Sequence, residues 1–161
     1  MKYLIYAGIG LLLVVVQVLI SRFLSIAGVS PDFVLIFLMW LVLREGQFVG
    51  ETAGFLLGFS LDIFSSGAIL GAHALSKTVA CFLIGYFFNE ERSEQQLQNW
   101  PFFILTLAGA LINNLLYYFL TTRGTEISFN EFAIKFGVVG ALYTVFVSIF
   151  PFLYWSRKRA F

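Results

Sequence analysis

The sequence is poor in charged residues and contains one cysteine and one histidine. Only 12% of its 161 residues are charged, and the formal net charge is +1, whereas an average soluble domain is about 25% charged. A chain this close to neutral lacks the basic surface of a nucleic-acid-binding protein. The single cysteine, Cys81, excludes an internal disulfide and makes a cysteine-ligated metal site a poor interpretation. The single histidine, His73, does the same for a histidine-rich metal site.

Apolar side chains are abundant and make up 60% of the chain. A soluble domain of this length has too much surface to bury so many of them. The runs are long and continuous, and lipid accepts only helices or closed barrels. We therefore predict an all-α integral membrane protein that forms a single transmembrane domain over residues 1–161. The predicted helices cover residues 3–21, 31–43, 48–64, 69–88, 101–120 and 129–155.

Two of these helices have informative ends. The first apolar run is longer than the core of a secretory signal, so we expect it to be retained as a helix. The second has an apolar core of only Phe33–Leu43, which is short for a bilayer and needs support from flanking residues or local thinning of the membrane. Ser128–Glu131 has the spacing of a capping box and suits the start of the sixth helix.

The distribution of basic residues predicts the orientation, because cytoplasmic loops are enriched in lysine and arginine. Six helices place both ends of the chain on one side of the membrane. That side carries Lys2, Arg44, Arg92, Arg157, Lys158 and Arg159. The other side carries Arg22 and Arg123, with Lys135 near its edge. We therefore expect both termini in the cytoplasm.

Polar residues inside the predicted helices gather toward the outer side. Lys77 lies about 12 Å below the outer end of its helix, where a charge costs about 2.5–3.5 kcal/mol on insertion scales. Asp32 and Asp62 are its candidate partners, and His73 shares its helix face four residues away. We infer an outward-open polar pocket. Its predicted lining is Asp32, Asp62, His73, Lys77, Asn113 and Asn114.

Each of these residues also has a structural interpretation. Asp32 at a helix start favours the helix dipole, and an Asp62–Lys77 ion pair would join the third and fourth predicted helices. His73 can be an interfacial side chain with satisfied hydrogen bonds. The neighbouring amides Asn113 and Asn114 can hold helices together through hydrogen bonds. Their concentration in one half of the membrane is the stronger indication of a site.

The third predicted helix carries a glycine at every fourth position. The stripe consists of Gly46, Gly50, Gly54 and Gly58. Such a stripe lets another backbone approach closely. It fits packing against a neighbouring helix of the same chain, and it also fits contact with a second subunit in a homodimer.

Catalytic groups are few. Ser76 lies three residues from His73, but nothing in the sequence orients the two as nucleophile and base. Paired aspartates can support acid–base chemistry, but the sequence does not fix their relative depth. We expect no enzymatic activity, no cofactor and no metal.

Two stretches resemble the MreD family of small membrane proteins from the bacterial rod-shape machinery. One is Pro31–Leu35, at the start of the second helix. The other runs from Gly54 through Leu61–Gly67 to Gly71–Lys77, where an aspartate and a glycine turn precede the pattern G-x-H-x-L-x-K. The family is similar in fold to the S-components of energy-coupling-factor transporters, which have six helices and an outward-facing pocket.

The resemblance implies a non-enzymatic scaffold in a bacterial inner membrane that binds MreC directly. The wider complex would include MreB, RodA and a class B penicillin-binding protein, and would direct peptidoglycan synthesis. Asp32, Asp62, His73 and Lys77 fall within the matching stretches and would supply polar contacts. A transporter S-component is the alternative, although residues 6–12 lack the Ala-x-x-x-Ala stripe that an energising partner grips. A third is a protein that binds membrane lipid precursors along a lateral groove.

Overall fold

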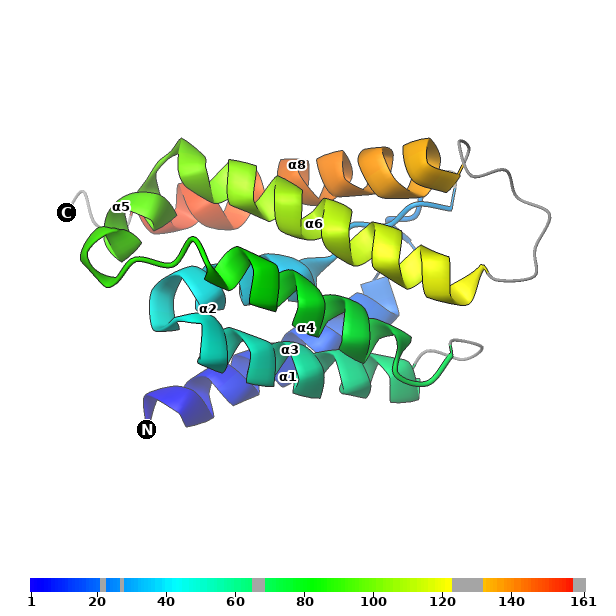
Figure 1. The fold of residues 1–161 in the computed structure, drawn as a ribbon, viewed down its shortest axis with the longest axis horizontal. Helices are drawn as coiled ribbons and strands as arrows, with labels where there is room; N and C mark the ends of the chain where they lie inside the picture. The colour runs from blue at the N-terminus through cyan, green and yellow to red at the C-terminus, as the bar shows by residue number, and fades with distance from the viewer. Residues whose placement is uncertain (21–22, 27, 65–68, 123–131, 158–161) are drawn as a thin grey trace.

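The computed structural model describes residues 1–20, 23–26, 28–64, 69–122 and 132–157. Within these ranges the protein is all-helical, apart from an isolated bridge between Ile26 and Val29, which confirms the all-α part of the predicted fold class. The elements are α1 (Lys2–Ile20), α2 (Phe33–Glu45), α3 (Gln47–Phe64), α4 (Ala72–Gly85), the short turn η1 (Glu90–Arg92), α5 (Ser93–Gln98), α6 (Trp100–Thr121), the π-helical η2 (Phe132–Val139) and α8 (Gly140–Arg157) (Figure 1). Among the residues that the structure describes, three segments are long and apolar enough to cross a membrane, namely α1, α6 and Ala133–Leu153.

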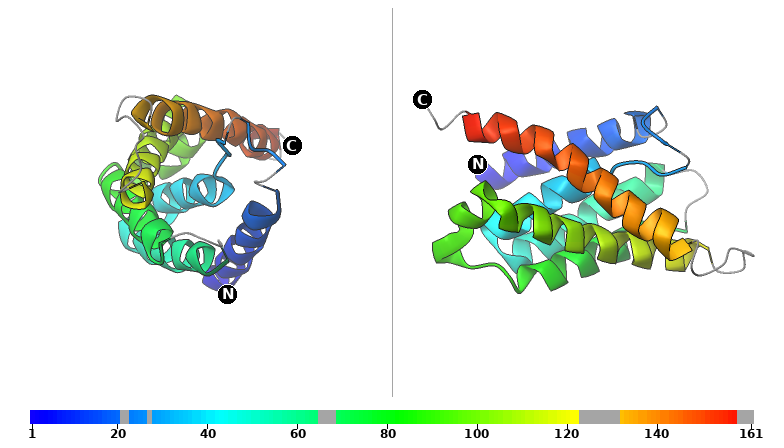
Figure 2. Two further views of the ribbon diagram at one scale, coloured as in Figure 1. Left: turned by 90° about the vertical axis from the view of Figure 1, so that its right-hand side faces the viewer. Right: turned by 90° about the horizontal axis from the view of Figure 1, so that it is seen from above.

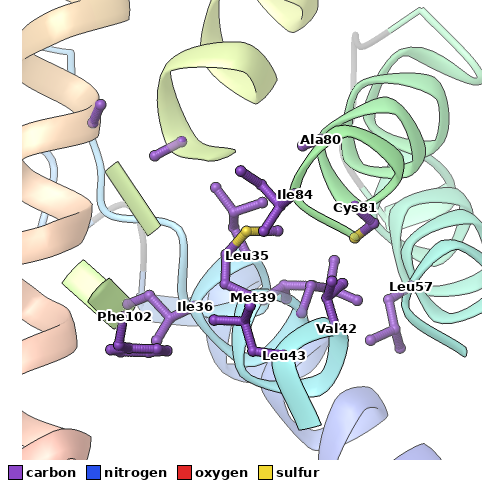
Figure 3. Packing of buried hydrophobic residues seen from close by; sticks show 14 of the residues in the cluster. Leu35, Ile36, Met39, Val42, Leu43, Leu57, Ala80, Cys81, Ile84 and Phe102 are labelled. Carbon is purple, nitrogen blue, oxygen red and sulfur yellow. The ribbon is translucent and has the colours of Figure 1, made fainter. Parts of the chain in front are cut away.

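Helix α2 lies at the centre of the bundle. It packs against α1, α3, α4, α5, α6 and α8, and the end-on view shows it enclosed by the other long helices (Figure 2). Its buried side chains are Val34, Leu35, Ile36, Leu38, Met39, Leu41, Val42 and Leu43. They meet Leu57, Cys81 and Ile84 from α3 and α4 in one apolar core (Figure 3). By contrast, α1 buries only Gly10 and Val14.

Both ends of α2 are set by single residues. Asp32 is its N-cap and accepts a hydrogen bond from the Leu35 N–H. Gly46 ends it with a φ of 95°, a left-handed conformation that side chains other than glycine rarely adopt. The 13 residues of α2 span about 20 Å, which is less than the roughly 30 Å of hydrocarbon in a bilayer.

The glycine stripe lies against helices of the same chain. A Cβ on Gly58 would lie 2.6 Å from the His73 carbonyl oxygen and 2.7 Å from the Ala74 Cα, while one on Gly54 would lie 3.2 Å from the Lys77 carbonyl oxygen. The backbones of α3 and α4 therefore touch along this stripe. At Gly50 the neighbour is Val42 of α2, at 2.2 Å.

Several predicted boundaries need correction. The fourth predicted helix, residues 69–88, is shorter as α4, because Gly71 has a φ of 95° and only Ala72 begins the helix. The polar stretch 89–99 contains the short helices η1 and α5. The last predicted helix opens in the π conformation of η2. The capping box at residues 128–131 lies outside the described residues.

The bundle has two distinct ends. The start of α1 and the end of α8 lie together with α5 and the Gly46 turn (Figure 1). We call this the terminal end. The opposite end, which holds the start of α4 and the last turn of α6, we call the distal end.

We predict that Gly58→Ala lowers the melting temperature of the detergent-solubilised protein, measured by scanning fluorimetry. The added methyl meets the backbone of α4, and overpacking of this kind costs about 1–3 kcal/mol. Gly8→Ala is the matched control, because a Cβ there meets nothing within 4 Å and alanine favours a helix by about 0.5–1 kcal/mol. An equal rise in melting temperature for both variants would contradict the close α3–α4 contact.

Candidate functional site

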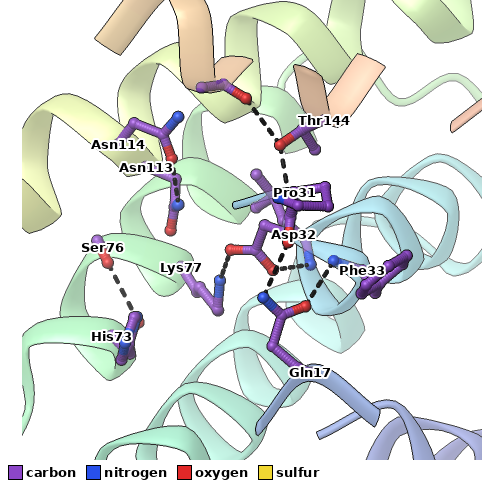
Figure 4. Close-up of polar contacts among 12 residues, drawn as sticks. Gln17, Pro31, Asp32, Phe33, His73, Ser76, Lys77, Asn113, Asn114 and Thr144 are labelled. Atoms are coloured by element: carbon purple, nitrogen blue, oxygen red, sulfur yellow. Dashed lines mark hydrogen bonds and ion pairs between the residues drawn. The ribbon is translucent and has the colours of Figure 1, made fainter. Parts of the chain in front are cut away.

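The site begins where the chain enters α2. Gln17 of α1 donates from Nε2 to the Pro31 carbonyl at 2.9 Å and accepts from the Phe33 N–H at 2.8 Å. The Asp32 N–H donates to Thr144 Oγ1 of α8 at 3.2 Å. These bonds satisfy backbone groups at the start of α2 that have no partner within the helix itself. Side chains from α1 and α8 are thereby joined to one short segment (Figure 4).

Lys77 of α4 forms an ion pair with the second oxygen of the Asp32 carboxylate. The Lys77 side chain is 0% exposed and the Asp32 side chain is 15% exposed. Of the two aspartates that the sequence offered as partners, the structure thus selects Asp32. The pair connects α4 to the central helix at the place where Gln17 and Thr144 also converge (Figure 4).

Asp62 has a different role from the predicted ion pair with Lys77. Its Oδ2 accepts from the N–H groups of Gly71 and Ala74 at 3.0 and 3.1 Å, and its Oδ1 accepts from the His73 N–H at 3.0 Å. Asp62 belongs to α3, so it caps the start of α4 from a neighbouring helix. A carboxylate at a helix N-terminus also interacts favourably with the helix dipole.

Aromatic and amide side chains of α4 and α6 lie next to this network. The His73 ring stacks on Tyr117 of α6, with ring centroids 4.1 Å apart and planes 13° apart. The Asn113 side chain donates to the Asn114 side chain at 3.1 Å, and Asn114 donates to the Phe136 carbonyl of η2 at 3.3 Å. The amide pair therefore connects α6 to the π-helical segment.

A polar cavity of about 200 Å³ opens at the distal end among these groups. Four of the six predicted pocket residues line it, namely Asp32, His73, Asn113 and Asn114. Lys77 and Asp62 do not; they lie behind its wall and fix the residues that do. Two buried atoms of the lining, His73 Nδ1 and Asn113 Oδ1, have no hydrogen-bond partner in the described part of the chain.

Several residues of this site were not included in the predicted pocket. Gln17, Ser30, Tyr117 and Tyr118 line the cavity, and Thr144 supports its wall. Gln17 carried a usable signal, because it is a lone amide in an otherwise apolar helix. Nothing in the sequence distinguished the two tyrosines or Thr144 as site residues, because aromatic and hydroxyl side chains are common in membrane helices.

The arrangement supports binding better than bond-breaking chemistry. Ser76 Oγ donates to the Ala72 carbonyl of its own helix at 2.8 Å, so it is not held against the His73 ring as a nucleophile would be. Across the described residues, no group of three or more histidine, cysteine, aspartate or glutamate side chains is placed to hold a metal ion.

We predict that Lys77→Met strongly destabilises the protein, by about 3–5 kcal/mol, because it leaves the Asp32 charge buried without its partner. Adding Asp32→Asn should restore most of the loss, since asparagine keeps the helix cap and removes the charge. Thermal unfolding in detergent measures both variants.

The matched control is Lys2→Met, which removes the Lys2–Glu45 pair at 2.7 Å, where the lysine is 57% exposed. Exposed pairs contribute about 0–1 kcal/mol. If Lys77→Met were as mild as Lys2→Met, the buried pair would not hold α4 to α2.

The sequence was compared with protein families, curated proteins and solved structures. The family described as rod shape-determining protein MreD matches residues 1–155. No curated protein and no solved structure matches the chain. The family match covers all the described helices except the last two residues of α8, together with every residue of the polar cavity, so the chain belongs to the MreD family of rod shape-determining proteins.

Proposed function

We propose that the chain crosses the membrane six times, through α1, α2, α3, α4, α6 and the combined η2–α8 segment. Three of these segments have the length and hydropathy of a membrane span. The others are central or short: α2 has 13 residues and α4 has 14. Short helices fit a bilayer when neighbouring elements cover their ends, as the Gln17 and Asp62 side chains do here.

The terminal end would face the cytoplasm of a bacterial inner membrane. Its described basic residues are Lys2, Arg44, Arg92 and Arg157, and the sequence adds Lys158 and Arg159. At the other side the sequence offers Arg22 and Arg123, outside the described residues, and Lys135 of η2. The positive-inside rule favours this orientation. The polar cavity then opens toward the periplasm, as in an S-component-like bundle.

Membership of the MreD family supports a role in rod shape determination. Within that role, the cavity would receive a membrane-proximal segment of MreC, and the protein would act as a scaffold without catalysing a reaction. MreB, RodA and a class B penicillin-binding protein would belong to the same assembly, which directs peptidoglycan synthesis.

The observation that carries this proposal is the polar lining of the cavity, in which His73 and Asn113 each keep one buried atom, Nδ1 and Oδ1, without a hydrogen-bond partner among the described residues. A buried polar atom without a partner costs about 1–3 kcal/mol. A peptide segment that supplies one donor or acceptor to each would recover that free energy on binding. The rigid wall behind them, held by Asp32 and Lys77, would keep both groups in place.

We predict that His73→Phe and Asn113→Leu each weaken binding of the cognate MreC by about tenfold, the effect of one lost hydrogen bond in a buried site. Phenylalanine keeps the stacking on Tyr117, and leucine keeps the volume of the amide. The measurement is the dissociation constant from titration of labelled protein in detergent or nanodiscs.

The control is Glu91→Gln on the exposed turn η1, which directly precedes α5 at the terminal end (Figure 1). It should bind MreC like the wild type. Melting temperatures of all three variants separate lost binding from lost folding. Equal affinity for the three variants would show that MreC binds elsewhere, and a copurified small molecule in the cavity would favour the transporter alternative.

A further inference from the structure

A second cavity lies apart from the polar site. It has a volume of about 720 Å³ and runs between α1 and α8, with α2 as its floor. Its apolar lining includes Ile9, Leu13, Phe37, Val147, Phe150 and Phe152. We call it the lateral groove.

The lateral groove exists because α1 and α8 pack on other helices. α1 packs on α2 and α3, whereas α8 packs on α2, α6 and η2. The end-on view shows the ring of helices open on the side between them (Figure 2). Ile9 and Phe150 beside the opening are 41% and 67% exposed. In the proposed membrane orientation this opening faces lipid.

The groove is too short for a membrane-spanning helix. Along α2 its lining runs from Phe33 to Trp40, about 10 Å at 1.5 Å per residue, against roughly 30 Å for the hydrocarbon core. Toward the distal end it is closed, because Tyr143 of α8 donates to the Leu24 carbonyl at 3.0 Å and Thr144 accepts from the Asp32 N–H. A groove that is closed at one end and confined to one leaflet fits a single flexible chain.

The open end of the groove is polar and carries both signs of charge. Glu94 and Gln98 of α5 line it, and Ser93 Oγ donates to the Leu43 carbonyl at 2.6 Å, which holds α5 against the last turn of α2. Arg44 of that turn does not line the groove itself; it lies 5.1 Å from the centroid of the Trp40 ring, which does, and 3.8 Å from the Glu45 carboxylate. A carboxylate and a guanidinium beside one apolar slot match the ammonium and phosphate of a zwitterionic headgroup.

We propose that the lateral groove binds one acyl chain of a zwitterionic phospholipid from the leaflet at the terminal end, with its headgroup between Glu94 and Arg44. The occupant is defined by its chemistry as a zwitterionic phospholipid, and phosphatidylethanolamine is the probe that the test uses. This inference rests on the proposed membrane insertion but not on MreC binding.

The test compares two double variants of the full-length protein. Leu13→Phe with Val147→Phe fills the groove, since both residues line it. The control, Leu12→Phe with Leu142→Phe, adds the same groups to the same helices at positions that are 63% and 53% exposed. Native mass spectrometry then measures bound phospholipid after titration with phosphatidylethanolamine or phosphatidylglycerol.

We expect the wild type and the control to retain one phosphatidylethanolamine, and the filled variant to bind it roughly tenfold more weakly, because the apolar area available to the chain is lost. Equal retention by the filled variant and the control would overturn the groove as the site. Preference for phosphatidylglycerol would overturn the zwitterionic headgroup, and a bound protein helix in place of lipid would overturn the occupant.

A second readout places the lipid. With Trp100→Phe and Trp155→Phe as background, Trp40 is the remaining tryptophan of the chain, and it lines the groove. Phosphatidylethanolamine brominated on its acyl chains should quench Trp40 fluorescence in nanodiscs, and the Leu13→Phe, Val147→Phe pair should reduce that quenching severalfold. Unchanged quenching in the filled variant would place the lipid outside the groove. MreC affinity should stay unchanged in this variant, which separates the two proposals.

Discussion

The structure depends on one constraint: the central helix begins among three other helices, where its polar backbone groups need partners from the protein. Pro31 is buried, and Asp32 and Phe33 are half-buried. Asp32 caps the helix, and Gln17 and Thr144 satisfy the flanking backbone. The cap carries a charge, and the buried Lys77 neutralises it. Four helices are thereby joined at the start of α2.

The two aspartates near this network have different structural roles. Asp32 accepts a hydrogen bond from a backbone N–H group in the first turn of α2 and pairs with Lys77. Asp62 accepts hydrogen bonds from three backbone N–H groups at the start of α4. Both carboxylates are occupied by structural tasks. His73 and Asn113 line the cavity, and each has one buried polar atom, Nδ1 and Oδ1, without a hydrogen-bond partner among the described residues. Lys77 and Asp62, which stand out in the sequence, lie behind the cavity wall, and the proposed binding would fall to the residues that line it.

The helices and the need for a carboxylate near Lys77 could be predicted from the sequence. The depth at which each helix begins and the packing between helices could not. Apolar runs indicate helices, and the burial cost of Lys77 requires a nearby carboxylate. The choice between Asp32 and Asp62 depended on how deep α2 begins, which hydropathy does not report. The start of α4 at Ala72 and the π-helical geometry of η2 depend on Asp62 and on packing against α6. Tyr117 and Thr144 became site residues only because the fold brought α6 and α8 beside the start of α2.

The same network determines where the bundle can remain open. Helix α1 is tied near its distal end by Gln17 and at its start by Lys2 and Tyr6, which donate to the Glu45 carboxylate at 2.7 and 3.0 Å. Between these ties its face toward α8 is not required to pack, and the lateral groove occupies that stretch. The polar cavity and the groove are thus two consequences of one arrangement. Polar bonds converge where α2 begins, and the space they do not close is apolar and opens sideways.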